Sequence, residues 1–496
     1  MNQTHVSRNA VQFCEGLAQK VFAIVLIAII SSIALAQTPA PLPSVVDPDL
    51  VVRTVATGLI QPTTMAFIGN NDLLVLEKAS GKVQRVTNGA IAGTVLDLHV
   101  NSASERGLLG IALHPKFPQT PYVYLYWTES TTGADSTDLG AVGLLGNRVD
   151  RFIWNGTSLL QERNIIRLRA YQADFGQPLR GNHNGGVLAF EDNARRNGNE
   201  PEKLYIFIGD NGRRGWLQNI LTILPVPNDQ FGGPEPDDTH LTGVVIRLND
   251  DGTTPKDNPF YEYGAQVGGI VGANLQKIFS FGRRNSFGMA VDPYSGNLWL
   301  QENSDDAFDE LGLVSSGSNG GWTQIMGPVS RIDQFKAIEV RRAGGLQQIR
   351  WPPDLIANTP REALQRLFTM PESRYRDPEF SWKFAVAPAG IGFMKGSGLG
   401  SKYDGDLFLG AARLNLANGY LFRMKLNESR RDLVHTDSRL ADRVADNLDK
   451  FEITESESIL FGRDFGVGTD IKTGPNGNLY VVSLSNGVIY EIARRR

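Results

Sequence analysis

The hydrophobic and polar positions along the chain form one recurring phrase. A short apolar strand is followed by a turn rich in Asp, Asn, Pro and Gly, and then by a second strand that opens on an aliphatic or aromatic pair. Turn-bounded runs of β-branched and aromatic residues are typical of hairpins and meanders. The turns and second strands of the six copies are Asn71–Val75, Pro121–Tyr124, Glu202–Ile206, Gly296–Leu300, Gly405–Leu409 and Gly477–Val481.

Each copy extends over further strands. The strands that precede the turns are Met65–Phe67, Gly110–Leu113, Val187–Phe190, Met289–Val291, Ile391–Phe393 and Asp470–Lys472. A third strand follows in several copies, namely Lys82–Val86, Val244–Leu248, Tyr420–Met424 and Gly487–Ile492. Such recurrence predicts stacked antiparallel blades, whose radial closure leaves no long open sheet edge. We therefore expect an all-β fold, one six-bladed β-propeller of four-stranded antiparallel blades over residues 51–496, rather than two unrelated β domains.

Insertions interrupt this repeat at about 131–146, 191–201, 211–241 and 325–385. Loops on a rigid scaffold usually carry the functional residues, so we expect the site among them. Composition agrees with the fold, because 53 Gly and 25 Pro among 496 residues suit a turn-rich chain. With 41% hydrophobic and 21% charged residues, the chain is neither disordered nor fibrous.

The first thirty-six residues differ from the rest. Lys20 precedes a short apolar run that ends in the small-x-small pattern Ala34-Leu35-Ala36, which is typical of a cleaved signal peptide over 1–36. An uncleaved anchor is the alternative, but the run is shorter than the roughly 20 apolar residues of a comfortable span. Residues 37–50 are expected to be a flexible mature N-terminus. The predicted location is secreted or periplasmic, with no stable membrane insertion after cleavage.

Charge and cysteine content exclude several classes of function. The formal net charge is −4 and the arginine pairs are scattered, so nucleic acid is not an expected partner. The single cysteine, Cys14, would leave with the signal peptide. The mature chain would then have no thiol for a disulfide, a nucleophile, a zinc or iron–sulfur site, or covalent haem. Redox chemistry would therefore need an organic cofactor or oxygen and nitrogen ligands.

Two polar clusters could supply a general base. His183 lies in Gly181-Asn182-His183-Asn184-Gly185-Gly186, directly before a predicted strand, and Asp210 ends another strand 27 residues later. A carboxylate beside an imidazole holds its tautomer and raises its basicity. The alternative is that both are ordinary turn residues, since Asp-Asn-Gly forms turns without any function.

Two further clusters are charged. Arg283 and Arg284 precede a strand and could hold a carboxylate or polarise a carbonyl, although a solvated turn is the usual explanation. The segment 301–310 carries five Asp and Glu side chains together with amide oxygens. Such oxygens suit a hard cation such as calcium, but the segment lacks the spacing of an EF-hand loop, and acidic loops are often merely hydrated.

Taken together, these clusters resemble the glucose/sorbosone dehydrogenase family of soluble aldose dehydrogenases that use pyrroloquinoline quinone (PQQ). The matching phrases run in order through most of the mature chain: Gly107–Pro115, His183–Gly186, Gly209–Gly212, Lys256–Phe260, Gly282–Asn285, Asp309–Leu311 and Gly320–Trp322. The family fold is the same six-bladed propeller that the repeats predict.

The resemblance also implies roles for individual residues. His183 falls on the base that takes the proton of the sugar's anomeric hydroxyl, and Asp210 on the carboxylate that orients it. Arg284 and Asn285 fall on the pair that lies over the quinone, and the arginine is expected to stabilise negative charge there. The expected ligands of calcium are Glu302 and the backbone carbonyls near Ser304 and Asp305. Glu105 and Arg413 fall on cofactor-contacting positions.

The chain departs from the family pattern at several of these positions. Arg283 stands where the family commonly has histidine, and Ser304-Asp305 replaces a Gly-Pro pair that supplies calcium carbonyls. Glu105 replaces a glutamine. The negative charge of Glu105 would repel a tricarboxylate cofactor unless Arg106 or a cation offsets it. Thr469 stands where the last blade usually has an arginine.

The expected function is an exported PQQ- and calcium-dependent enzyme that oxidises an aldose, or a related sugar, to its lactone and passes electrons to an external acceptor. Two alternatives come from other classes of protein. The first is a non-catalytic propeller that serves binding, and the second is a calcium-dependent lactonase of similar shape.

Overall fold

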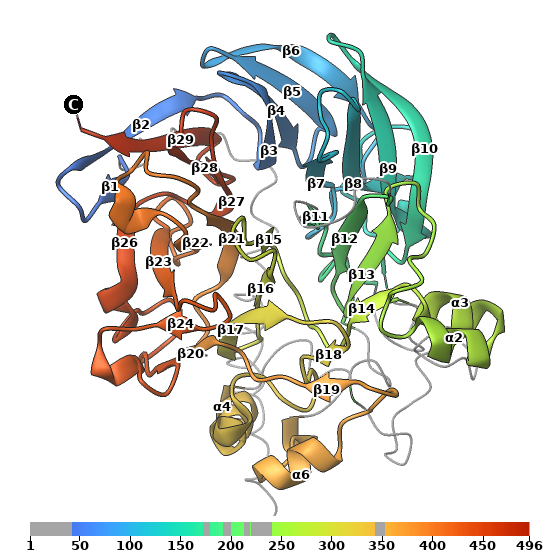
Figure 1. Ribbon diagram of the computed structural model, residues 1–496, viewed down its shortest axis with the longest axis vertical. Coiled ribbons are helices and arrows are strands. Elements are labelled where there is room, and N and C mark those ends of the chain that lie inside the picture. Colours follow the sequence, from blue (N-terminus) through green and yellow to red (C-terminus); the bar gives the residue numbers. More distant parts are fainter. Residues whose placement is uncertain are drawn as a thin grey trace, which may run out of the picture. The chain divides into compact units, whose positions relative to one another are not determined.

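The computed structural model describes residues 42–171, 179–191, 200–212, 219, 241–342 and 353–495. The predicted signal peptide, residues 1–36, lies outside the described residues. The compact part of the chain begins at Pro41. Within it, the strands form the six small antiparallel sheets that the repeats predict (Figure 1).

The first three blades follow one another along the chain. The first contains β3 (Pro62–Gly69), β4 (Asp72–Glu77), β5 (Lys82–Thr87) and β6 (Ala90–Asp97). The second contains β7 (Leu108–Leu113), β8 (Tyr122–Ser130), β9 (Val142–Trp154) and β10 (Leu159–Leu168). The third contains β11 (Leu188–Phe190), β12 (Lys203–Ile208), β13 (Val244–Asn249) and β14 (Ile278–Ser280).

The last three blades recruit extra strands from elsewhere. The fourth contains β15 (Met289–Val291), β16 (Leu298–Glu302), β17 (Ala307–Val314) and β20 (Phe380–Phe384), with β25 (Val444–Ala445) at its edge. The fifth contains β21 (Pro388–Phe393), β22 (Leu407–Ala411), β23 (Tyr420–Leu426) and β26 (Leu460–Arg463), joined by β24 (Leu433–Val434) and β1 (Ser44–Val45). The sixth contains β27 (Gly468–Thr473), β28 (Leu479–Ser483), β29 (Val488–Arg494) and β2 (Leu50–Ala56).

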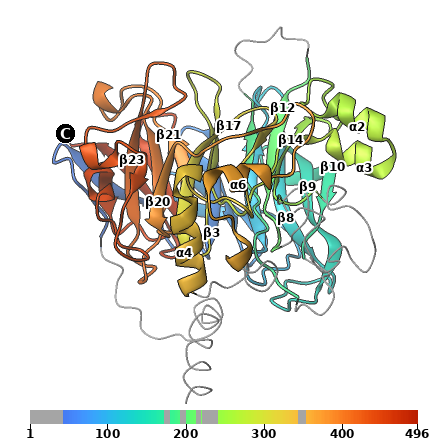
Figure 2. The ribbon, with the colours of Figure 1, turned by 90° about the horizontal axis from the view of Figure 1, so that it is seen from below.

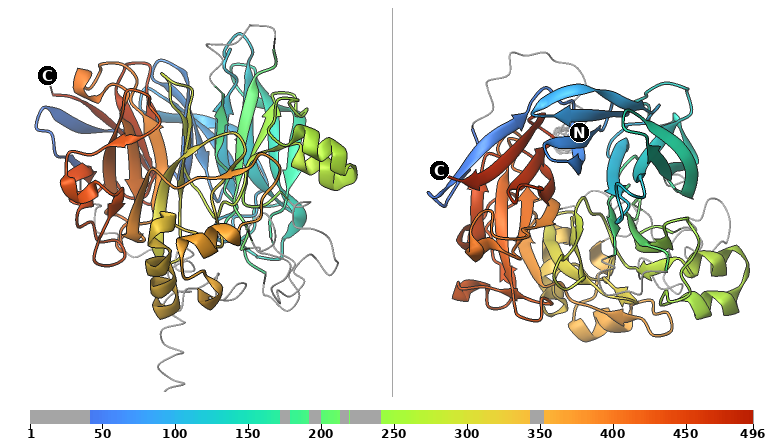
Figure 3. Two further views of the ribbon diagram at one scale, coloured as in Figure 1. Left: turned by 60° about the horizontal axis from the view of Figure 1, so that its bottom comes forward. Right: turned by 45° about the horizontal axis from the view of Figure 1, so that its top comes forward.

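The two ends of the described chain close the ring. β2 pairs antiparallel with β29, with Leu50 opposite Arg494, so the sixth blade combines N-terminal and C-terminal strands. Figure 3 shows the blue and red strands side by side. β1 adds to the outer edge of β26, so residues 44–45 are paired although we expected 37–50 to be flexible. The edge strand of the fifth blade thereby gains hydrogen-bond partners.

The innermost strands of consecutive blades contact one another in the order β3, β7, β11, β15, β21, β27 and back to β3. Each neighbouring pair of blades also shares a cluster of buried apolar side chains. Successive side chains of one strand enter different clusters: Leu73 packs toward the sixth blade and Leu74 toward the second. Because both faces of a blade are buried, its strands are apolar along most of their length.

The insertions carry the helices. α2 (Tyr261–Val267) and α3 (Gly269–Leu275) follow the third strand of the third blade, and α4 (Ile332–Arg342) and α6 (Pro360–Gln365) precede β20. Figure 2 shows these two helix pairs on separate sides of the ring. The same region holds the short sheet of β18 (Ser318–Asn319) and β19 (Arg374–Tyr375). Among the described residues, no helix is long and apolar enough to cross a membrane.

Candidate active site

Motifs from the second, third and fourth blades meet where the innermost strands of these blades begin. His183 precedes β11, Asp210 follows β12, Arg284 precedes β15 and Glu105 precedes β7. Backbone contacts hold these segments together: the amide of Asp210 donates to the carbonyl of Arg284 (2.9 Å), and the amide of Glu105 donates to the carbonyl of Gly181 (2.9 Å). The sequence-predicted residues His183, Asp210, Arg284, Asn285 and Glu105 are thus gathered in one cluster.

Glycines make this close approach possible. A Cβ atom on Gly110 of β7 would lie 1.9 Å from the carbonyl oxygen of Gly186, and one on Gly209 would lie 2.5 Å from the carbonyl oxygen of His183. No side chain fits in either gap. The glycines of the predicted motifs therefore allow the backbones of neighbouring blades to touch beside His183.

His183 and Asp210 form a buried pair. Nδ1 of the imidazole lies 2.5 Å from Oδ1 of Asp210, and only 4% of His183 and 2% of Asp210 is exposed. Burial opposes the charge of Asp210, but the charge and hydrogen bond of His183, with help from Arg284, keep the pKa of this carboxyl below its ordinary value. An ionised Asp210 places a proton on Nδ1 and leaves Nε2 as the free acceptor of the ring.

Trp322 fixes the other oxygen of the carboxylate. Its indole Nε1 donates to Oδ2 of Asp210 (2.8 Å), and the guanidinium of Arg284 lies 5.2 Å from the centre of its ring. The Gly-Gly-Trp phrase was visible in the sequence, but it gave no sign of this role. The partners are 112 positions apart, and a tryptophan in a glycine-rich turn is compatible with many contacts.

Glu105 links His183 to Asn285, the residue beside Arg284. Its Oε2 accepts hydrogen bonds from the backbone amide of His183 (2.6 Å) and from Nδ2 of Asn285 (3.0 Å). Arg106 donates to Asn101 and to the carbonyls of Leu139, Ala170 and Arg180, and these contacts do not include Glu105.

Arg284 and Lys78 are cations near Glu105, and the sequence did not single out Lys78. Its ammonium group donates to the carbonyls of Ser102 (3.1 Å) and Ser104 (2.9 Å). Burial lowers the pKa of Lys78 to about 8, although the charge of Glu105 acts in the opposite direction. Lys78 thus places a titratable positive charge at this cluster.

Arg284 is buried and held by several partners. Its backbone amide donates to Glu302 (2.8 Å), its Nη1 donates to the carbonyl of Asn303 (2.6 Å), and its Nη2 pairs with Asp305. Burial works against its charge, but Asp305 and Asp210 outweigh that effect and raise the pKa of Arg284. The side chain therefore keeps its charge at a fixed place.

The side chains at the expected calcium positions are engaged by protein groups. Oε2 of Glu302 pairs with Arg283 (2.8 Å) while Oε1 accepts from the amide of Arg284. The hydroxyl of Ser304 donates to Asp309 (3.1 Å), and Asp305 is paired with Arg284. Across the described ranges, no three His, Asp or Glu side chains gather so as to hold a metal ion. This set of donors does not fit calcium.

Arg413 lies in the loop after β22, in the fifth blade. It packs over the ring of Tyr420, with 4.9 Å between the guanidinium carbon and the ring centre. It lines a separate pocket of about 410 Å³ with Lys450 and Asn418. None of the contacts of the described residues connects it to His183 or Glu105. The resemblance implies a cofactor contact for this arginine, and that role stays a prediction.

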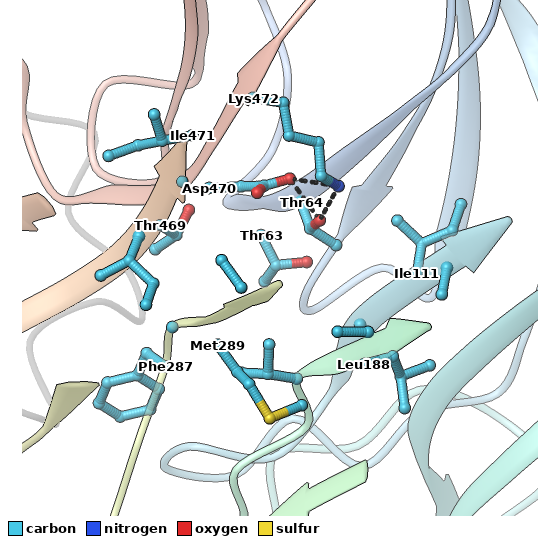
Figure 4. A pocket seen from close by; sticks show the side chains of 18 of the residues that line it. Thr63, Thr64, Ile111, Leu188, Phe287, Met289, Thr469, Asp470, Ile471 and Lys472 are labelled. Carbon is cyan, nitrogen blue, oxygen red and sulfur yellow. Dashed lines mark hydrogen bonds and ion pairs between the residues drawn. The ribbon is translucent and has the colours of Figure 1, made fainter. Parts of the chain in front are cut away.

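An axial cavity of about 660 Å³ opens beside the cluster. All six innermost strands line it, and Lys78, Ser104, Glu105, Gly185 and Phe287 line the end near His183. Its wall is largely apolar, as at Ile111, Leu188 and Met289 in Figure 4. Among the labelled polar residues in that view, Thr64 donates to Asp470 (2.6 Å), and Lys472 pairs with the same carboxylate. Bulky side chains therefore do not plug the hollow.

Comparisons with known proteins agree with this arrangement. The sequence profile of the family described as Glucose / Sorbosone dehydrogenase matches residues 59–348. Quinoprotein glucose dehydrogenase B of Acinetobacter calcoaceticus is 29% identical over 286 residues, which is 55% of this chain and 52% of that protein. Aldose sugar dehydrogenase YliI of Escherichia coli (strain K12) is 24% identical over 90% of this chain and 93% of its own length.

Solved structures show the same fold. The PQQ-bound form of aldose sugar dehydrogenase from Streptomyces coelicolor superimposes with a TM-score of 0.55 at 22% identity, covering 92% of this chain and all of that one (100%). The family profile covers more than half of the chain, and its motifs are the ones that converge on His183. The chain therefore belongs to the glucose/sorbosone dehydrogenase family.

Proposed function

We propose that this protein is an exported, PQQ-dependent dehydrogenase that oxidises an aldose, or a related sugar, to its lactone with His183 as general base. The observation that carries the proposal is the buried His183–Asp210 pair at 2.5 Å, beside the mouth of an open axial cavity. Membership of a family with quinoprotein and aldose-oxidising relatives supports the same class of cofactor and substrate.

Two buried polar atoms beside the pair fit a flat cofactor that carries carbonyl groups. Nε of Arg284 and Oδ1 of Asn285 have no hydrogen-bond partner among the described residues, although the two residues are only 3% and 2% exposed. Unpaired buried polar atoms are rare and costly, so they favour a ligand that completes them. Arg284 and Asn285 would hold the quinone part of PQQ, and Lys78 would add positive charge for its carboxylates.

The residues of the cluster divide the work of the reaction. When bound, PQQ supplies the quinone that takes up hydride from the anomeric carbon of the sugar. His183 accepts the proton of the anomeric hydroxyl at Nε2, because Asp210 occupies Nδ1. Asp210 stabilises the charge that the imidazole gains, and Arg284 stabilises negative charge opposite it. The sugar loses a hydride and a proton to become a lactone, and the electrons leave through a separate acceptor.

The proposal is tested with the purified protein, PQQ and a redox dye. We expect PQQ to bind with a change in its absorbance, aldoses to reduce the dye, and His183→Ala to abolish dye reduction while PQQ still binds. A matched control is His114→Gln, because His114 is also buried (5% exposed) and its Nε2 lies 3.4 Å from Asp250. His114 follows the C-terminal end of β7, whereas Glu105 precedes the N-terminal end. The His114→Gln variant should therefore keep full activity.

Two outcomes would contradict the proposal. Absence of both PQQ binding and dye reduction with every sugar would favour a non-catalytic binding propeller. Hydrolysis of lactones without a quinone would favour a lactonase, although the paired acidic side chains between Glu302 and Asp306 give no support to a calcium-dependent one.

A further inference from the structure

The loop formed by residues 302–306, between β16 and β17, carries three carboxylates, and each has its own cationic partner. Glu302 pairs with Arg283 at 2.8 Å, Asp305 pairs with Arg284, and Asp306 pairs with Lys450. The side chains of Glu302 and Arg283 are only 4% and 6% exposed. Each carboxylate of the 302–306 loop is therefore paired with a cationic side chain of the protein.

Cationic side chains also donate to two backbone oxygens of the 302–306 loop. Nη1 of Arg284 donates to the carbonyl of Asn303 (2.6 Å), and Nζ of Lys450 donates to the carbonyl of Asp305 (2.8 Å). Calcium binds six to eight oxygens, mostly from carboxylates and carbonyls. Here such oxygens already accept hydrogen bonds from positively charged donors.

The neighbouring carboxylate of Asp309 is no more available. It accepts from the amide and hydroxyl of Ser304 (2.7 and 3.1 Å) and from the amides of Val386 (2.6 Å) and Ala387 (2.8 Å). These bonds attach the 302–306 loop to the segment before β21. A calcium ion would have to displace them, and it would be repelled by Arg283, Arg284 and Lys450 at short range in a buried site.

Lys450 is held in place by its own backbone. The amide of Lys450 donates to Asp449 (2.7 Å), and the next amide, that of Phe451, donates to the carbonyl of Ala385 (2.9 Å). The turn that contains Lys450 is therefore fixed against Ala385, the residue that follows β20. The ammonium group of Lys450 is directed into the 302–306 loop. An ammonium ion fixed in this way is a point charge with several donors, which suits carbonyl and carboxylate oxygens.

We propose that this protein works without calcium, and that Lys450 and Arg283 supply at the 302–306 loop the positive charge that a calcium ion would bring. Both are positioning residues, because they act on the loop that holds Arg284 rather than on the substrate. The proposal rests on the proposed function only where it concerns the cofactor. Whether the loop binds calcium is a property of the protein alone.

The test measures calcium directly. Wild-type protein is dialysed against calcium chloride, with and without PQQ, and its bound calcium is measured by mass spectrometry of the metal. We expect no stoichiometric calcium, and no change in thermal midpoint or in PQQ absorbance on adding a chelator. In Lys450→Gln the carbonyl of Asp305 and the carboxylate of Asp306 are released, so we expect this variant to bind calcium and to gain thermal stability when calcium is added.

Lys383→Gln is the matched control, because Lys383 is equally exposed (31% against 30%) and pairs with Asp446 at 3.5 Å. It should behave as the wild type. Stoichiometric calcium in the wild type that is lost in Glu302→Gln would overturn the proposal. A Lys450→Gln variant that gains no calcium would overturn the role of Lys450. Failure of PQQ to bind would instead count against the proposed function, since the arm without PQQ still decides the calcium question.

Discussion

Nδ1 of His183 lies 2.5 Å from Oδ1 of Asp210, although 27 positions separate the two residues in the chain. The contact links the residue before the first strand of the third blade to the residue after its second strand. Trp322 holds the second oxygen of Asp210. The imidazole is thus fixed from one side, and its other nitrogen is left for chemistry.

Replacing Asp210 with asparagine should lower kcat by about 10²- to 10⁴-fold while PQQ still binds. The amide of asparagine can donate to Nδ1, which would place the proton on Nε2 and remove the base. Steady-state kinetics with a dye and PQQ absorbance are the measurements. Trp322→Phe, which removes the hydrogen bond to Oδ2 but leaves Asp210 ionised, should cost less. An unchanged kcat in Asp210→Asn would contradict the role of the pair.

Glu105→Gln should tighten the binding of the anionic cofactor by about tenfold, or about 1.4 kcal/mol. The amide oxygen of glutamine can still accept from the amide of His183 and from Asn285, whereas the negative charge is gone. Titration of the protein with PQQ gives the dissociation constant. Weaker binding would show that the charge of Glu105 acts through Lys78 rather than against the cofactor.

Binding of PQQ should weaken as the pH rises through about 8, the pKa of Lys78. Below that pH the ammonium is charged, and above it the positive charge at the cavity mouth is lost. Because burial lowers this pKa in the folded protein, folding becomes more favourable as the pH rises from about 8 toward the ordinary value of 10.5. Lys78→Met should remove the pH dependence of PQQ binding. Persistence of that dependence in the variant would assign it to another group.

Glu302→Gln should lower the free energy of unfolding by about 3–5 kcal/mol, because it leaves Arg283 buried without its partner. Asp449→Asn is the control: Asp449 also pairs with an arginine, Arg342, at 2.6 Å, but its side chain is 63% exposed. The control should change stability by about 1 kcal/mol or less. Denaturant titration compares the two, and equal losses would show that the Arg283–Glu302 pair is not energetically special.

Gly110→Ala should reduce activity by about 10²-fold and also lower the thermal midpoint, because its Cβ atom would meet the carbonyl of Gly186 at 1.9 Å and displace the His183 segment. Gly143→Ala, in the same blade, is the control, because a Cβ atom there meets nothing within 4 Å. Kinetics and thermal unfolding are measured for both variants. Full activity in Gly110→Ala would mean that the two backbones can separate without moving the base.

The sequence alone determined the propeller and brought His183 and Asp210 to one end of a blade. Leu73 and Leu74 are both apolar because each faces a different neighbouring blade, so the strand pattern records burial on two faces. The motif around His183 has the glycines that a close backbone contact requires, and Asp210 follows within the same blade. These features are local in the chain, and local patterns encode burial and turn geometry.

Only the tertiary structure decided which charges pair. Lys450 reaches the carbonyl of Asp305 across 145 positions, Trp322 reaches Asp210 across 112, and Arg413 lines a pocket together with Lys450. The acidic segment resembled a metal site because its carboxylates are close together in sequence. Their cationic partners Arg283 and Lys450 come from other segments of the chain. Charges act through space, and which side chains lie close is set by closure of the ring, which brings loops of different blades to one rim.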